Sequence, residues 1–261
     1  MQPLAFPLPS LKAGCKGAAG AALLILGIAA PARAGCGDAP KPGVDWTGCS
    51  KPQLMLSKDD LSQAIFSKAS LSSTDFAGAK LAGAKLDGAE LSYVRFTGSD
   101  LSGADLGKAV GWRTNFTQAN LEKVNLQMAH VSRASFAQAR MAGANLTKSE
   151  MSRSDFTGAD LSGVDMSKAE LARTTFVGAK LTGVSFNFAN LGRANLTGAD
   201  LGGVGMQGAH LYLTQIGGAN LSGATGLTQA QIEIACGTSQ TKLPAGLVRP
   251  KGWPCGAEDA E

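Results

Sequence analysis

One feature constrains the fold of this chain most: a large apolar residue recurs at every fifth position over a long, uninterrupted stretch. The series runs from Leu61 to Leu221, and of its 33 positions only Gly111 is not large and apolar. Two residues before these positions, from Ala64 to Ala219, the chain carries only Ala, Val, Thr or Ser. The repeating unit is therefore small–x–large–x–x, and it contains no insertions.

A period of five fits neither an α-helix of 3.6 residues per turn nor a strand of period two. It fits short extended pieces, each followed by a bend. The large residue and the small residue two before it then point to the same side. Four such pieces close a square around the large side chains, and successive squares stack at the strand spacing of ~4.8 Å.

A second period, of 20 residues, supports four pieces per turn. It is seen in six phenylalanines that fall on one wall of the squares: Phe76, Phe96, Phe116, Phe136, Phe156 and Phe176. The four threonines among the small positions, two residues before this series, lie on the same wall. The sequence thus predicts an all-β stack of about eight four-sided coils.

Triplets of Ala, then Asp or Asn, then Leu recur through the array. They are Ala104-Asp105-Leu106, Ala119-Asn120-Leu121, Ala144-Asn145-Leu146, Ala159-Asp160-Leu161, Ala194-Asn195-Leu196, Ala199-Asp200-Leu201 and Ala219-Asn220-Leu221. These triplets resemble the A-(D/N)-L-x-x signature of the pentapeptide-repeat family, over about two thirds of the chain. The resemblance implies a right-handed quadrilateral β-helix, and it alone supplies the handedness.

The ends of such a stack need covers, because an open end exposes core side chains and unpaired backbone. We expect a signal peptide, an N-terminal cap, the β-helix and a C-terminal cap, over residues 1–34, 35–58, 59–225 and 226–261. Trp46 and Trp253 are expected to pack within the two caps. In the C-terminal cap, Thr228 and Gln231 predict a capping box for one short helix over residues 229–236.

The N-terminus is typical of a secretory signal. Lys12 and Lys16 precede an apolar run, residues 18–30, and Ala32-Arg33-Ala34 matches a cleavage site. The run is shorter than the ~20 residues that span a bilayer. We therefore expect cleavage after Ala34, a periplasmic or secreted location and no stable membrane span afterwards. A lipoprotein is the lesser alternative, because Cys36 lies close to the cleavage site.

Four cysteines remain beyond the leader, as one pair near each end of the array: Cys36, Cys49, Cys236 and Cys255. An even number in an exported chain indicates disulfides. Four cysteines allow three pairings, and the long array between the pairs favours the local one. The spacing does not suggest a zinc site.

Charge and motifs argue against several functions. The net charge is +4, but without residues 1–34 the chain has 21 basic and 20 acidic residues, which does not indicate nucleic-acid binding. Phosphate loops, nucleophile elbows and metal-binding motifs are absent from the sequence. The two histidines, His130 and His210, are four coils apart. We predict a protein that is not an enzyme and has neither cofactor nor metal.

One wall of the predicted coils differs from the others. Two residues after its large position it carries Arg113, Arg133, Arg153, Arg173 and Arg193. The same wall holds Trp112, Tyr93, Tyr212 and both histidines. Two interpretations remain open. The arginines are neutralised by Glu90, Glu150, Glu170 and Asp155, or they bind an anionic partner, such as an anionic polymer or an acidic protein.

The leading functional hypothesis is an exported, non-enzymatic binding or structural module. Resemblance to the family suggests an alternative, a DNA-mimicking inhibitor of gyrase or another topoisomerase. Such relatives are cytoplasmic and strongly acidic, whereas residues 56–225 contain 16 basic and 14 acidic residues. A polysaccharide-active enzyme is a third class, but no paired carboxylates are evident in an aromatic cleft.

Overall fold

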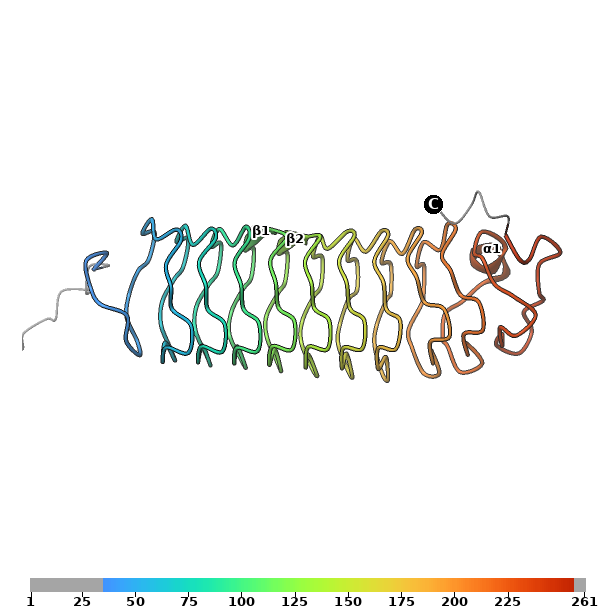
Figure 1. Cartoon of the computed structure of the whole chain (residues 1–261). Coiled ribbons are helices and arrows are strands. Elements are labelled where there is room, and N and C mark those ends of the chain that lie inside the picture. The colour runs from blue at the N-terminus through green and yellow to red at the C-terminus, as the bar shows by residue number, and fades with distance from the viewer. Residues whose placement is uncertain (1–34, 256–261) are drawn as a thin grey trace, which may run out of the picture. The chain divides into compact units, whose positions relative to one another are not determined.

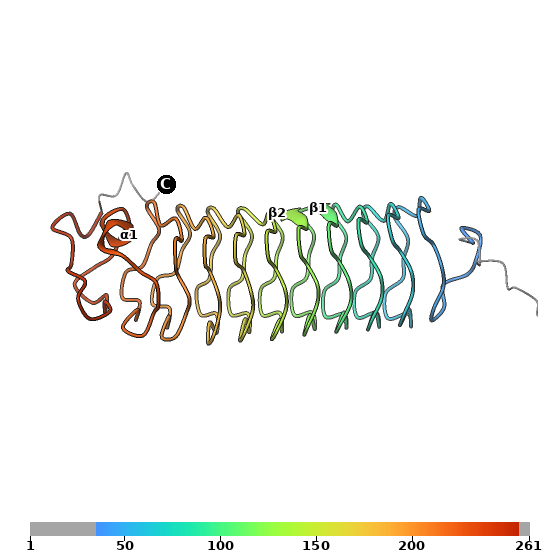
Figure 2. The same ribbon diagram turned by 180° about the vertical axis from the view of Figure 1, so that it is seen from behind.

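The computed structural model describes residues 35–255, so the expected signal peptide at 1–34 lies outside the described residues. Most of the described range winds into stacked coils, and the path of each coil repeats that of its neighbour (Figures 1 and 2). Parallel bridges join residues 20 apart, from the pair Asp45–Ile65 to the pair Gly205–Thr225. The 20-residue period and the β-helix architecture are thus confirmed.

Each coil is held to the next by single extended residues rather than by long strands. Around Asn120, for example, its amide donates to the Ser99 carbonyl at 2.9 Å, and its carbonyl accepts from the Leu101 amide at 2.8 Å. Within residues 35–255 only β1 (Val110–Trp112) and β2 (His130–Ser132) are longer, and they pair in parallel. They lie side by side on neighbouring coils (Figure 2).

The large residue of each unit fills the interior of the coil. From Phe76 to Phe176 the six phenylalanine rings stack, with centroids 4.8 to 5.2 Å apart and planes within 6° of parallel. All six are fully buried. The stack therefore measures the rise from coil to coil at about 5 Å, which is the strand spacing expected.

The regular coil begins earlier than the boundary at residue 59 that we expected. The ladder already pairs Asp45 with Ile65. Trp46 occupies an interior position, 1% exposed, with its ring 5.5 Å from that of Phe66. The apolar series hides this coil because Lys51 stands at the next large position, where its Nζ lies 4.6 Å from the Trp46 ring centroid.

The N-terminal cap is correspondingly short. Cys36 and Cys49 form a disulfide with their Cα atoms 5.6 Å apart. The Gly35 amide donates to the Asp45 carbonyl at 3.0 Å, and Trp46 Nε1 donates to the Asp38 carbonyl at 3.2 Å. These contacts hold the first residues of the described chain over the end of the interior.

The C-terminal cap contains the expected capping box, but its helix is shorter than predicted. Helix α1 (Gln229–Glu233) is capped by Thr228. The Thr228 hydroxyl accepts from the Gln231 amide, and the Gln231 side chain accepts from the Thr228 amide. The helix does not reach Cys236, because the backbone of that residue joins the ladder. The Cys236 amide donates to the Thr214 carbonyl at 2.9 Å, and its carbonyl accepts from Ile216 at 2.8 Å.

The rest of the cap lies at the end of the stack, beside α1 (Figure 1). A disulfide joins Cys236 to Cys255, with Cα atoms 5.4 Å apart. Trp253 Nε1 donates to the Ala235 carbonyl at 2.6 Å, and its ring lies against the Gly237 backbone, where a side chain would collide. Among residues 35–255, no helix is long and apolar enough to cross a membrane.

Candidate functional site: the Arg wall

We call one side of the stack the Arg wall. It consists of the four-residue pieces 90–93, 110–113, 130–133, 150–153, 170–173, 190–193 and 210–213. The fourth residue of each piece stands at a corner of its coil. Five successive corners carry arginine: Arg113, Arg133, Arg153, Arg173 and Arg193. At a rise of about 5 Å per coil, these five corners span about 20 Å.

The arginines occupy corners whose backbone favours glycine. Their φ angles lie between 53° and 60°, in the left-handed region, which costs a residue with a Cβ about 1 kcal/mol. Corners on another wall carry glycine in this conformation, as at Gly83 and Gly103. Lysine and glutamine fill others, as at Lys148 and Gln118. The backbone conformation of these corners therefore does not explain why five successive corners of one wall carry arginine.

Most of these arginines are not neutralised by a neighbouring carboxylate. Arg113, Arg133, Arg153 and Arg193 form no ion pair with any acidic residue of the part of the chain that the structure describes. This contrasts with Lys180 on the opposite wall, whose Nζ lies 3.3 Å from the carboxylate of Asp160 in the preceding coil.

The acidic residues that could neutralise the five arginines of the Arg wall are bonded to other groups. Glu150 lies 3.0 Å from His130 Nδ1, and Glu170 accepts from Asn190 Nδ2 at 2.8 and 2.9 Å. Glu90 accepts from the Ser92 amide at 2.8 Å, and Asp155 accepts from the Thr157 amide at 2.8 Å. The first interpretation, a neutralised ladder, therefore lacks its expected pair for Arg153.

Exposed aromatic side chains stand near both ends of the arginine ladder. Tyr93 is 56% exposed and Trp112 39% exposed at one end, and Tyr212 is 50% exposed at the other. The Arg133 guanidinium carbon lies 4.7 Å from the Trp112 ring centroid, within the range of a cation–π contact. All eight residues proposed from the sequence thus share one wall.

Gly111, the one interior position without a large residue, lies against Thr114, although Thr214 makes the equivalent hydrogen bond beside the buried Leu211. The Thr114 hydroxyl donates to the Leu91 carbonyl at 2.9 Å, and a Cβ at residue 111 would lie 2.5 Å from that hydroxyl oxygen. In β1 the Trp112 amide donates to the Ser92 hydroxyl at 3.2 Å. The threonines of the small positions thus have a role that spacing did not reveal.

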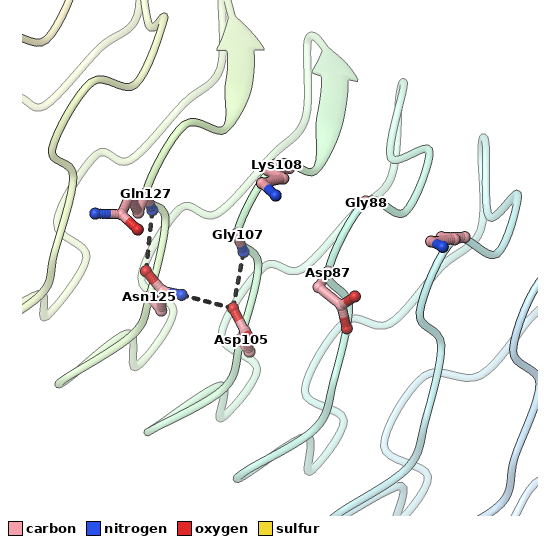
Figure 3. A pocket seen from close by; sticks show the side chains of 8 residues that line it. Asp87, Gly88, Asp105, Gly107, Lys108, Asn125 and Gln127 are labelled. Atoms are coloured by element: carbon pink, nitrogen blue, oxygen red, sulfur yellow. Dashed lines mark hydrogen bonds between the residues drawn. The ribbon is translucent and has the colours of Figure 1, made fainter.

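A pocket of about 290 Å³ lies on the wall next to the Arg wall, and sequence reasoning missed it. Gly88, between Lys68 and Lys108 in the corner series, leaves the space (Figure 3). Asp105 Oδ1, on its floor, accepts from the Gly107 amide at 2.9 Å and from Asn125 Nδ2 at 2.8 Å.

No three His, Cys, Asp or Glu side chains of residues 35–255 gather closely enough to hold a metal ion. The carboxylates with the clearest pKa shifts are engaged in local bonding. Hydrogen bonds from Ser62 lower the pKa of Asp60, and hydrogen bonds led by that from Ser162 lower the pKa of Asp160.

Solved structures match large parts of this chain. A trypsin-treated variant of QnrB1, a plasmid-mediated fluoroquinolone resistance protein, matches 75% of this chain and 92% of its own, at 18% identity and a TM-score of 0.50. HetL, a pentapeptide repeat protein of the cyanobacterium Nostoc involved in heterocyst differentiation regulation, matches 80% of this chain and 92% of its own, at 26% identity and a TM-score of 0.37. No match is found among curated protein sequences.

The repeat itself matches a known family, described as Pentapeptide repeats, in eight copies. The matched segments are residues 60–92, 89–127, 114–153, 149–187 and 189–225. These segments cover more than half of the chain and coincide with the coils of the ladder. The chain therefore belongs to the pentapeptide-repeat family.

Proposed function

We propose that this protein is an exported, non-enzymatic binding module that recognises an anionic partner through the Arg wall. Its scaffold is a β-helix that is right-handed, as the family resemblance implies, and has about eight coils, as the number of five-residue units predicts. The observation that carries the proposal is the set of four exposed or half-exposed corner arginines that form no ion pair within the described residues. The two disulfides support export, because such bonds persist in oxidising compartments.

Repulsion between the stacked arginines favours the binding of an anion. Two like charges about 4 Å apart in water repel by about 1 kcal/mol, and the corners are one coil apart. An anion that contacts several guanidinium groups removes this repulsion and gains charge-assisted, often bidentate, hydrogen bonds. Because the arginines are at the surface, salt should weaken the binding.

The alternative function is inhibition of gyrase or another topoisomerase by mimicry of DNA. The likeness to QnrB1, at 18% identity, supports the shared fold alone. Mimicry of DNA requires an acidic surface, whereas residues 56–225 hold 16 basic and 14 acidic residues. We therefore place this function second.

The test compares the wild type with two triple variants. Arg133, Arg153 and Arg173 are changed to Gln in one, and Lys108, Lys148 and Lys168 in the other. Both remove three positive charges from corners with φ near 60°. The probes are polyglutamate, polygalacturonate and phosphatidylglycerol vesicles, titrated at several salt concentrations.

We expect at least one probe to bind the wild type in a salt-dependent manner. The arginine variant should lose at least tenfold in affinity, while the lysine variant stays within twofold. Equal losses in both variants, or no binding of any probe, would refute the proposal. Inhibition of DNA supercoiling that persists in the arginine variant would favour the alternative.

A further inference from the structure

We infer that the partner is an α-helix with a stripe of acidic side chains, which lies lengthwise along the Arg wall. This inference rests on the proposed function and names the kind of anion. It is carried by three properties of the wall: its spacing, the apolar residues at its two ends, and the charge of its second edge.

The spacing of the arginines fits a helix better than an extended chain. Successive coils rise by 4.8 to 5.1 Å along the Phe96–Phe176 stack. Acidic residues placed alternately three and four positions apart recur every ~5.3 Å along one helix face. Over the four steps from Arg113 to Arg193 the mismatch reaches only about 1 Å.

The side chains of an extended peptide would not stay in register with the same five arginines. Its side chains on one side recur every ~6.7 Å, so over four steps it would slip by about 7 Å, which is more than one coil. Only two or three carboxylates of such a peptide could face arginines at once. A helical stripe can face all five.

The apolar ends of the ladder set the length of the helix. In the corner series, Tyr93 precedes the five arginines and Leu213 follows them. These two corners are six coils, about 30 Å, apart, which is the length of a helix of about 20 residues. We therefore expect the acidic stripe to be flanked by one apolar side chain at each end.

The C-terminal end of the wall offers a cavity for one of these apolar side chains. A pocket of about 320 Å³ is lined by Tyr212 and Leu213 of the last coil, and by Ile234 and Trp253 of the C-terminal cap, among others. Tyr212 and Ile234 are 50% and 39% exposed. At the other end Tyr93 and Trp112 provide exposed aromatic surface, of the kind enriched at binding hot spots.

Part of the second edge of the wall carries glutamates, which bond to His130 and Asn190 but still argue against a uniform polyanion. Glu150 and Glu170 pair directly in the ladder, three residues before the corners Arg153 and Arg173. Between Trp112 and Tyr212, the half-exposed residues that separate the two edges are small, as at Ser152 and Ala172. A helix can turn acidic side chains toward the arginines and basic ones toward the glutamates, whereas an acidic glycan or a lipid surface meets both edges with the same sign.

The experiment uses the full chain and three synthetic peptides of about 20 residues. The first is a helix former with five Glu in one stripe, Lys along the flank and Leu at both ends. The second has the same composition with its Glu distributed around the helix. The third alternates Glu with Thr and favours an extended strand. Fluorescence anisotropy gives each Kd at low salt, with polygalacturonate as a competitor.

We expect the striped helix to bind at least tenfold more tightly than either other peptide. Arg133, Arg153 and Arg173, changed together to Glu, should abolish this binding and create binding of a striped peptide with Lys in place of Glu. The triple change to Gln should weaken binding without creating the new one. It retains the fold, because Gln118 and Gln138 already occupy such corners at φ 59° and 58°. The Lys108, Lys148 and Lys168 variant is the control.

Two results would overturn the inference in different ways. If the scrambled or strand peptide, or polygalacturonate, binds through the same arginines as tightly as the striped helix, the helical partner is wrong and anion recognition stands. If no acidic probe binds in a manner that depends on these arginines, the proposed function falls as well.

Discussion

At the scale of single residues, the Asp or Asn that precedes many interior residues has a clear physical purpose. Its side-chain oxygen accepts the backbone amide two residues further on, as from Ser62 to Asp60 at 3.1 Å and from Thr147 to Asn145 at 3.0 Å. Short side chains that bear an acceptor favour this local bond, and Glu90 makes the same bond with the Ser92 amide at 2.8 Å. The family signature therefore reflects the hydrogen bonding of the bend as well as the packing of the interior.

The pair of Asp75 and Arg95 predicts how stability depends on pH. Asp75 is buried and accepts from Arg95 Nε at 2.8 Å, and this hydrogen bond lowers the pKa of Asp75. A group with a lowered pKa stabilises the fold above its unfolded pKa of ~3.9, and this stabilisation is lost as the pH falls through the folded pKa. Asp75→Asn should thus lower the Tm at pH 7, and its difference from the wild type should shrink below about pH 4.

Thermal unfolding followed by circular dichroism between pH 2 and pH 7 checks this expectation. The exposed Asp200, which accepts from Asn220 Nδ2 at 3.1 Å, provides the control variant Asp200→Asn. A difference for Asp75→Asn that is as large at pH 2.5 as at pH 7 would contradict the assignment.

At the scale of the coil, the phenylalanine stack should carry much of the stability. Phe136 is fully buried, with its ring 4.9 Å from Phe116 and 4.8 Å from Phe156. Phe136→Ala should cost about 3–5 kcal/mol, because the cavity cannot collapse between two stacked rings. Lys148→Ala, at an exposed corner, should change stability by no more than about 0.5 kcal/mol. Chemical denaturation measures both, and equal effects would contradict the division into interior and exterior.

Strand β1 gives a second prediction, which concerns Gly111 and Thr114 together. Gly111→Ala should destabilise by about 1–3 kcal/mol, because the added Cβ meets the Thr114 hydroxyl at 2.5 Å. Thr114→Ala removes that oxygen, so the double variant should lose less stability than the two single variants summed. A double-mutant cycle by chemical denaturation tests this, and strict additivity would show that the two positions do not compete for space.

The sequence predicted the elements that depend on neighbouring residues and missed those that depend on contacts between distant residues. The five-residue period predicted the interior side chains, because each unit satisfies the same local geometry. The first coil escaped because Lys51 interrupts the apolar series, although Trp46 keeps the register. Helix propensity could not predict the end of α1, because the backbone of Cys236 forms hydrogen bonds with Thr214 and Ile216 of the preceding coil instead of continuing the helix. The 20-residue spacing of the arginines predicted that they share one wall. Their lack of carboxylate partners depends on side-chain positions, which the sequence does not give.

For the whole molecule, the caps predict its chemical state after export. The protein should begin at Gly35 and contain no free thiol, because Cys36–Cys49 and Cys236–Cys255 use all four cysteines that follow the leader. Intact mass and thiol titration of the exported protein measure both properties. A mass that includes residues 1–34, or any titratable thiol, would contradict this expectation.

The pairing of each residue with the one 20 positions later also determines which changes of length the protein can survive. Removal of one complete coil would shorten every wall by one rung and leave each side of the stack chemically in phase. Removal of a single five-residue unit would rotate everything downstream by a quarter turn, so the later arginines would continue onto a neighbouring side and the phenylalanine column would be broken. Within the repeat array, only insertions and deletions of 20 residues or a multiple of 20 therefore preserve the chemistry of every wall, whereas the C-terminal cap accommodates the longer spacings Gln215–Cys236 and Asn220–Lys242.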